Sequence, residues 1–268
     1  QQTTDGGYIV AGSSIVTSPS GNSDFWIVKL DAIGNITWQK SLGGSNDADA
    51  VSIQQTTDGG YIVSGAYVAD NFNFDSWIVK LDAIGNITWQ KSLGGSYDDR
   101  ASSIQQTTDG GYIVAGYSSS NDGDVTGNNG YSDFWIVKLD AIGNITWQKS
   151  LGGSGGDYAS SIQQTTDGGY IVSGYSESID GDVTGNNGNL DYWIVKLDAT
   201  GNITWQKSLG GSYDDVAYSI QQTTDGGYIV AGLSASDDGD VTGNNGGVDS
   251  WIVKLDATGN ITWQKSLG

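Results

Sequence analysis

The chain has 268 residues with neither cysteine nor histidine, and 31 acidic against 11 basic residues give it a net charge of −20. Without these two residue types, disulfides, thiol chemistry, Ser-His and Cys-His catalytic pairs and His-ligated zinc are excluded. The negative charge argues against nucleic-acid binding, which needs clustered Lys and Arg. No apolar run is long enough for insertion into a membrane.

One unit of sequence recurs five times along the chain. The string QQTTDGGYIV begins at residues 1, 54, 105, 163 and 221, WIVKLDA at 26, 77, 135, 193 and 251, and GNITWQKSLG at 34, 85, 143, 201 and 259. In the third copy, alternating apolar and polar residues predict four strands, at 101–108, 112–117, 133–140 and 145–151. No stretch has the spacing and the caps of a helix.

The four strands of each unit predict one small antiparallel sheet. Such a sheet cannot bury both of its faces alone, so the five sheets must pack on one another. A four-stranded repeat of this length is typical of a propeller blade. The predicted fold is therefore all-β: a single five-bladed β-propeller of four-stranded antiparallel blades over residues 1–268. The predicted blades are approximately 1–43, 44–94, 95–152, 153–210 and 211–268.

The repeated strings also carry a resemblance. Units of the form DGGYIVAG…WIVKLD…GNITWQKSLGGS make the whole chain similar to β-propeller repeat proteins secreted by bacteria. The blade layout distantly resembles the kelch-type blade, although the double glycine of a kelch blade ends its second strand, whereas here Asp-Gly-Gly precedes it. This resemblance implies a propeller with an extracellular or cell-surface location, and it implies little about activity.

The long loop between the second and third strands of a unit is a candidate Ca²⁺ site. Its oxygen-bearing side chains alternate with glycines, and Ca²⁺ takes six to eight oxygen ligands. The candidate ligands are Asp122, Asp124, Asn128 and Asp133, then Asp180, Asp182, Asn186 and Asp191, then Asp238, Asp240, Asn244 and Asp249. The alternative, which the composition favours, is a loop whose side chains cap their own backbone. Copies one and two have a different loop, so five equivalent sites are not expected.

Each unit also contains the sequon Asn-Ile-Thr in its last turn. It places candidate glycosylation sites at Asn35, Asn86, Asn144, Asn202 and Asn260. The alternative, again favoured, is an ordinary turn asparagine that tolerates positive φ.

Acidic and aromatic residues in the linkers and loops complete the set of candidates. The linker acids are Asp47, Asp49, Asp98, Asp99, Asp157, Asp214 and Asp215. Paired carboxylates can serve glycoside hydrolysis, but a catalytic pair should occur once, so these are interpreted as solvated acids or secondary cation ligands. The repeated Trp residues are expected in the core. The variable aromatics Phe72, Phe74, Tyr97, Tyr131 and Tyr213 are the better candidates for contact with a partner.

The sequence thus predicts an extracellular propeller that is not an enzyme. Its expected role is a structural or an adhesion and interaction module that binds a protein or a glycan or associates with itself, with Ca²⁺ as the one candidate cofactor. Two alternatives stay open. One is a multivalent carbohydrate-binding lectin, and the other is an engineered or amplified repeat propeller without a specific ligand.

Overall fold

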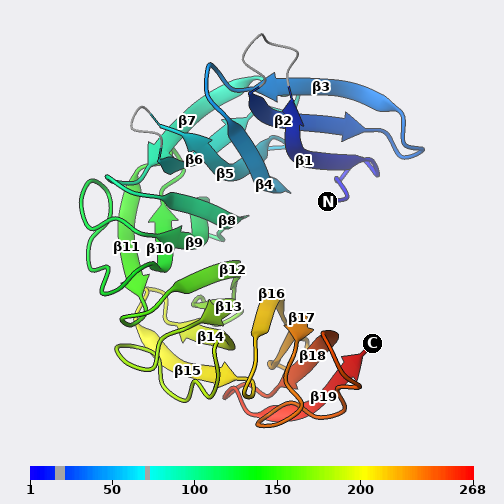
Figure 1. Ribbon diagram of the computed structural model, residues 1–268. Helices are drawn as coiled ribbons and strands as arrows, with labels where there is room; N and C mark the ends of the chain where they lie inside the picture. The colour runs from blue at the N-terminus through cyan, green and yellow to red at the C-terminus, as the bar shows by residue number, and fades with distance from the viewer. Residues whose placement is uncertain (16–21, 70–72) are drawn as a thin grey trace. The chain divides into compact units, whose positions relative to one another are not determined.

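The computed structural model describes residues 1–15, 22–69 and 73–268, and every regular element in this part of the chain is a β-strand. The strands form five antiparallel sheets that follow one another in chain order, from blue to red in Figure 1. The fold is the predicted all-β, five-bladed β-propeller class. The described residues contain no helix long and apolar enough to cross a membrane.

Each sheet is a meander whose neighbouring strands are also neighbours in the sequence. The first sheet contains β1 (Tyr8–Ile15), β2 (Ser23–Leu30) and β3 (Ile36–Leu42). The second contains β4 (Ala48–Gln55), β5 (Tyr61–Val68), β6 (Phe74–Leu81) and β7 (Ile87–Leu93). The third contains β8 (Asp99–Gln106), β9 (Tyr112–Ser118), β10 (Asp133–Leu139) and β11 (Ile145–Leu151). The fourth contains β12 (Asp157–Gln164), β13 (Tyr170–Ser176), β14 (Asp191–Leu197) and β15 (Ile203–Leu209). The fifth contains β16 (Asp215–Gln222), β17 (Tyr228–Ser234), β18 (Asp249–Leu255) and β19 (Ile261–Leu267).

The first sheet has three strands among the described residues. In the repeat, Gln1 and Gln2 correspond to Gln54 and Gln55, which are the last two residues of β4 in the second copy. Gln2 still forms an isolated bridge to Tyr8. The predicted four-strand pattern therefore applies in full to the other four sheets.

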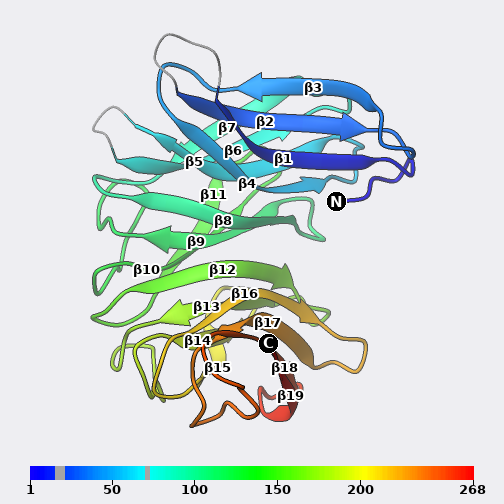
Figure 2. The ribbon, with the colours of Figure 1, turned by 45° about the vertical axis from the view of Figure 1, so that its right-hand side comes forward.

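The chain divides into two compact units, and the division runs through the third sheet. Unit 1 consists of Gln1–Val114, Ser120–Val125 and Lys138–Thr146, and unit 2 of Ala115–Ser119, Thr126–Val137 and Trp147–Gly268. Within unit 2, β16 lies beside β12 and contacts it, as the turned view of Figure 2 also shows.

Two glycine-containing turns join the strands of a sheet. Between β8 and β9, Thr107 N–H donates to the Gly111 carbonyl at 2.9 Å, and Gly110 adopts a φ of 84°. Between β10 and β11, Asp140 N–H donates to the Asn144 carbonyl at 2.9 Å, and Gly143 has a φ of 82°. Both positions need the left-handed backbone that glycine adopts without steric cost.

The core lies between successive sheets of each unit. In unit 1, Phe25 of β2 packs on Trp77 of β6 with ring centroids 4.5 Å apart. In unit 2, Tyr192 of β14 packs on Trp251 of β18 at 4.7 Å. Trp135, Trp193 and Trp251 are at most 2% exposed, whereas Trp26 and Trp263 are 38% and 47% exposed, so the prediction that the repeated Trp residues belong to the core is correct for the first three and wrong for the last two. Each buried Trp ring contributes roughly 2–3 kcal/mol.

The lysine of the repeated Trp-Ile-Val-Lys-Leu string pairs with the aspartate of the Asp-Gly-Gly turn in all five copies, and in the first four copies it is buried. Lys80 is 4% exposed; its ammonium lies 2.9 Å from Asp58 Oδ2 and donates to the Leu81 carbonyl at 3.0 Å. Partial burial raises the pKa of Asp58, but hydrogen bonds from Thr56, Lys80 and the Gly60 amide outweigh it and lower this pKa to about 2. The equivalent pairs are Lys29–Asp5, Lys138–Asp109, Lys196–Asp167 and Lys254–Asp225.

Candidate functional site

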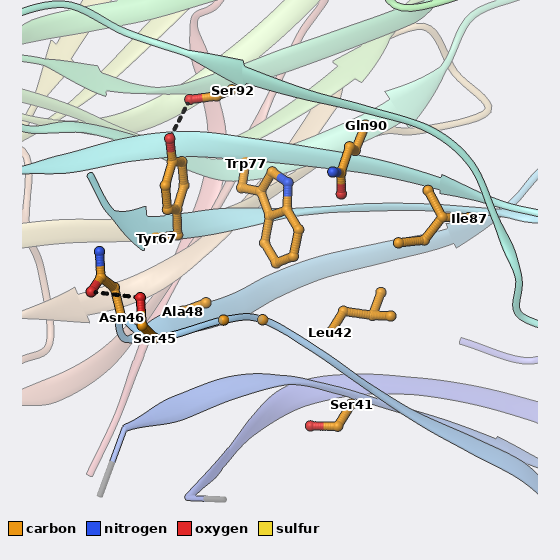
Figure 3. A pocket seen from close by; sticks show the side chains of 12 residues that line it. Ser41, Leu42, Ser45, Asn46, Ala48, Tyr67, Trp77, Ile87, Gln90 and Ser92 are labelled. Carbon is orange, nitrogen blue, oxygen red and sulfur yellow. Dashed lines mark hydrogen bonds between the residues drawn. The ribbon is translucent and has the colours of Figure 1, made fainter. Parts of the chain in front are cut away.

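A pocket of unit 1 lies against the second sheet and has a half-buried aromatic wall. Its volume is 680 Å³, and it is lined among others by Leu42, Ala48, Tyr67, Trp77, Gln90 and Ser92. Figure 3 shows the Trp77 ring facing this space, with the Tyr67 hydroxyl hydrogen-bonded to Ser92 Oγ at 2.8 Å. No charged side chain is among the lining residues that the structure describes. The pocket therefore suits a flat, uncharged ring that carries a hydroxyl group.

The same position in the fifth sheet is filled by the protein itself. There Val241, 2% exposed, packs with Leu209 and Trp251 in one core cluster, and the Thr242 N–H donates to Gln264 Oε1 at 3.1 Å. Both residues belong to the loop 235–248, whereas β5 and β6 are joined by residues 69–73 alone. The shorter connection of the second copy leaves no described counterpart of Val241, and Trp77 is correspondingly half-buried.

Two substitutions in the second copy add to this difference. Ala48 begins β4 opposite Tyr67 of β5, whereas Asp215 begins β16 opposite Ser234 of β17. A carboxylate and a hydroxyl are thus replaced by a methyl group and a phenol ring at corresponding positions. The second copy therefore has an aromatic pocket where the fifth has buried acid and filled core.

The loops predicted to bind Ca²⁺ hold their four candidate side chains on separate partners. In the fourth copy, Asp180 Oδ1 accepts the Ser154 N–H at 2.7 Å, and Asn186 Nδ2 donates to the Ser176 carbonyl at 2.9 Å. Asp182 Oδ2 accepts the Gly152 N–H at 3.3 Å. Asp191 Oδ2 accepts the Asn187 N–H at 2.8 Å. The corresponding residues of copies three and five, Asp122, Asn128, Asp238 and Asn244, make the same type of contact. The four side chains of one loop therefore do not converge on one point.

Instead, carboxylates from three segments lie around the first glycine of a Gly-Gly pair in the linker between two sheets, such as Gly152-Gly153. At Gly152, the position of a hypothetical Cβ lies 2.4 Å from Asp157 Oδ2 and 2.6 Å from Asp133 Oδ1. The Gly152 N–H also faces Asp182 Oδ2 at 3.3 Å. The same arrangement recurs at Gly210 with Asp191, Asp215 and Asp240, and at Gly94 with Asp75, Asp99 and Asp124. We refer to these three sets as the glycine-pair clusters.

The carboxylates of these clusters are buried and strongly perturbed. Asp133, Asp157, Asp191 and Asp215 are each 0% exposed. Desolvation raises the pKa of Asp133, the Asn129 amide opposes it, and the charges of Asp157 and Asp182 raise it further, to about 7. The pKa of Asp191 is raised to about 7 for the corresponding reasons. The interpretation of Asp99, Asp157 and Asp215 as solvated acids is wrong, because each of these residues is fully buried at the start of a strand.

Within the described ranges, no group of three or more acidic, His or Cys side chains is arranged so that it could hold a metal ion. The glycine-pair clusters offer two closely opposed carboxylates with a third bound to the glycine amide. Whether these residues hold Ca²⁺ stays a prediction.

The five sequon asparagines are exposed at the turn that precedes the last strand. Asn144 Nδ2 donates to Asp140 Oδ2 at 3.0 Å, and its backbone N–H donates to Asp140 Oδ1 at 2.8 Å. Equivalent bonds form at Asn35, Asn86, Asn202 and Asn260. Each asparagine thus has a structural role in its turn, and glycosylation stays a prediction.

The loop aromatics differ in their exposure. Tyr97, Tyr131 and Tyr213 are 62%, 82% and 57% exposed. Phe74 is half-buried beneath Arg100, whose guanidinium carbon lies 3.4 Å from the ring centroid. Phe72 lies outside the described residues. Sequence reasoning missed Tyr67 and Trp77 as a pair; the signal that could have found them was the shortened loop beside a Trp that copies three to five bury.

Comparison with solved structures shows the fold. A protein of unknown function from Dyadobacter fermentans matches with a TM-score of 0.55 and 13% identity, over 100% of this chain and 81% of that one. A protein of unknown function from Bacteroides caccae matches with a TM-score of 0.54 and 13% identity, over 91% and 76% of the two chains. A Bacillus megaterium levansucrase matches with a TM-score of 0.52 and 11% identity, over 99% and 82%.

Sequence comparison gives one curated relative and one family. The regulatory protein FlaEY of Caulobacter vibrioides is 29% identical over 191 residues, which are 66% of this chain and 20% of that protein's length. The sequence profile of Arylsulfotransferase (ASST) matches residues 14–154 and 137–268. Because that family transfers sulfate enzymatically, the expectation that this chain is not an enzyme is wrong. The chain belongs to the arylsulfotransferase family.

Proposed function

We propose that this chain transfers a sulfuryl group to an aromatic alcohol whose ring binds in the pocket of the second sheet. The observation that carries the proposal is the pocket itself, where the half-buried Trp77 ring and the Tyr67 hydroxyl face one uncharged space. Aromatic rings prefer offset or edge-to-face contact with other rings, which adds about 1 kcal/mol to the burial of apolar area. Membership of the arylsulfotransferase family supports the same reaction class.

The reaction exchanges one S–O bond for another. The S–O bond of an aryl sulfate donor breaks, the acceptor hydroxyl oxygen forms the new S–O bond, and the proton of the acceptor passes to the leaving phenolate. Because the chain has neither histidine nor cysteine, another side chain must handle this proton, and a hydroxyl group can do so. The pocket offers the hydroxyls of Tyr67 and Ser92, whose oxygens are 2.8 Å apart.

The test is sulfuryl transfer from 4-nitrophenyl sulfate to phenol, followed by the absorbance of released nitrophenolate and by mass detection of phenyl sulfate. Trp77→Ala should raise KM for phenol on the order of tenfold through lost ring contact and burial. Tyr67→Phe should lower kcat, whereas Tyr97→Phe, which removes an exposed hydroxyl outside the pocket, should leave it unchanged. No phenol-dependent release by the native chain, or an unchanged KM in Trp77→Ala, would rule out the proposal.

The proposal includes a location outside the cytoplasm, in the extracellular space or at the cell surface. It is supported by the resemblance of the whole chain to secreted bacterial repeat proteins. Fractionation of the source cells with an antibody against this chain tests it, and recovery only with cytoplasmic markers would oppose it.

A second candidate role is a binding surface for a protein or a glycan. The specific observation is that the rings of Tyr131 and Tyr213 in unit 2 are 82% and 57% exposed, and exposed tyrosines are enriched where partners bind. A glycan array and a crosslinking experiment on intact cells, each repeated with Tyr131→Ser and Tyr213→Ser, would test this role. Binding that both variants retain would remove it.

A further inference from the structure

We propose that the glycine-pair clusters at Gly152 and Gly210 each bind a divalent cation of the Ca²⁺ type between two successive sheets. The cluster at Gly94 has the same layout in unit 1. This inference is independent of the pocket and of sulfuryl transfer, because it rests on other residues.

The first observation is a buried carboxylate oxygen without a partner at the centre of each cluster. Asp133 uses its Oδ2 to accept the Asn129 N–H at 3.0 Å, while its buried Oδ1 has no hydrogen-bond donor among the described residues. Asp191 shows the same division, with Oδ2 bound to the Asn187 N–H at 2.8 Å and Oδ1 buried without a donor. Nearly all buried polar atoms are satisfied in native proteins, so these oxygens indicate a ligand.

The second observation is that a carboxylate of the next sheet approaches the unpartnered oxygen, although Asp157 Oδ2 itself accepts hydrogen bonds from the Gly153 N–H at 2.9 Å and from Ser178 Oγ at 2.8 Å. Asp133 Oδ1 and Asp157 Oδ2 both lie within 2.6 Å of the place where Gly152 would carry a Cβ. At Gly210, Asp191 Oδ1 and Asp215 Oδ2 lie within 2.6 Å of the equivalent point. The missing side chain of the glycine is therefore what lets two carboxylates approach each other.

Charge is the third observation. The charges that act on Asp133 are those of Asp157 and Asp182, and both are acidic. Like charges without a counter-ion are expensive to bury, and they become favourable once a dication lies between them. Oxygen-only donors match Ca²⁺, whose flexible shell of six to eight ligands water and backbone carbonyls can complete. The clusters contain no nitrogen or sulfur side chain, which zinc prefers.

The competing occupant is a proton shared between two carboxylates. Asp133 and Asp191 carry raised pKa values, and a shared proton would satisfy the same oxygens. Protons and Ca²⁺ compete for one pair of carboxylates, so the pH dependence of binding separates the two occupants.

The chain supplies its own control in the first copy. Asp24 Oδ1 points at Gly43 as Asp133 Oδ1 points at Gly152, but Ala48 stands where Asp157 stands, and Asp24 is only half-buried. Asp24 also receives a hydrogen bond from Ser41 Oγ at 2.8 Å. Asp24 corresponds to Asp133 but has no second carboxylate opposite it, so Asp24→Asn removes an acid at this place in the repeat without breaking a carboxylate pair.

The experiment is calorimetric titration of chelator-treated full-length chain with CaCl₂, and separately with MgCl₂, at about pH 8 and about pH 5. We expect Ca²⁺ at the two clusters of unit 2 and at the third in unit 1, and a rise in Tm of roughly 5 °C or more at saturating Ca²⁺ and the higher pH. Asp133→Asn and Asp191→Asn should each remove one bound ion, the double variant two, and Asp24→Asn none.

The outcomes decide the proposal. The proposal is overturned if Ca²⁺ gives neither heat nor a Tm shift at the higher pH and the chain is more stable at the lower pH. In that case a proton, and not a cation, lies between the two carboxylates. An unchanged number of bound ions in the double variant assigns the binding to surface acids and also overturns the proposal. The Asn variants keep an acceptor for the Asn129 and Asn187 amides, and circular dichroism confirms that they fold. If they do not fold, Asp182→Asn, which changes the third acid of the Gly152 cluster, should remove one bound ion in the same titration.

Discussion

Asp133→Asn should stabilise the chelator-treated chain at pH 8 and should not do so near pH 4. The carboxyl is 0% exposed, and its pKa is raised from 3.8 to about 7. An acid with a raised pKa in the folded state holds its proton more tightly there than in the unfolded chain. Its contribution to the free energy of unfolding is therefore fully present below about pH 4 and is lost as pH rises toward about 7.

The size of this effect follows from the pKa difference. One pKa unit corresponds to 1.36 kcal/mol, so ionising Asp133 in the folded chain costs about 4 kcal/mol at pH 8 in the absence of a cation. An amide avoids this cost and still accepts the Asn129 N–H. Asp191→Asn should behave in the same way, because its pKa is also raised to about 7.

Urea unfolding in chelator at pH 4, 6 and 8 measures the difference between native chain and variant. The variant should gain stability relative to the native chain as pH rises, and Asp24→Asn should show no such gain. If Asp133→Asn instead lowers the free energy of unfolding by the same amount at every pH, ionisation of Asp133 does not destabilise the folded chain. The electrostatic account of the cluster is then wrong.

Two further predictions concern the repeated framework. Asp58→Asn should cost about 2 kcal/mol near pH 7 by leaving buried Lys80 without its carboxylate. Because the pKa of Asp58 is lowered to about 2, this difference should be present above about pH 4 and disappear as pH falls toward 2, which urea titrations at several pH values would check. Gly143→Ala should cost more than Gly110→Ala by chemical denaturation, although both glycines have positive φ near 83°. The added Cβ at Gly143 meets the Trp89 ring at 2.8 Å, whereas nothing lies within 4 Å at Gly110; equal costs of about 1 kcal/mol would mean that the ring simply moves away.

Periodicity was sufficient to predict the strands because each apolar or aromatic string is repeated in an extended pattern. The predicted strand 145–151 coincides with β11, and 133–140 exceeds β10 by one residue. The first strand of the third copy was displaced: 101–108 was predicted, and β8 spans Asp99–Gln106. Thr107 is already part of the turn, since its N–H and carbonyl bond Gly111 and Gly110. Side-chain alternation does not reveal which residue closes a turn.

That displacement explains the error on the linker acids. With the strand starting at residue 101, Asp99 and its equivalents would stand in a solvated linker. With the strand starting two residues earlier, Asp157 faces Ser176 across the ladder and is fully buried. The loop acids were predicted to converge within one loop, but Asp182 bonds to Gly152, which belongs to the preceding linker. Such a pairing between distant segments is a tertiary event that no local spacing contains.

The pocket and the clusters are two outcomes at one position of the repeat. In the fourth copy, Asp157 starts the first strand and lies opposite Ser176. The long loop of this copy bonds through Asp182 to Gly152 of the preceding Gly-Gly linker, and the result is a buried group of acids. Where Ala48 and Tyr67 occupy the same two places and the loop is short, the partner carboxylate of Asp24 is missing and an aromatic wall faces an open space. The last strand, Ile-Thr-Trp-Gln-Lys-Ser-Leu, is identical in every copy, so it cannot determine the difference. The two kinds of site thus differ at the two strand-end residues and in the length of one loop, which are positions that the repeated strings do not include.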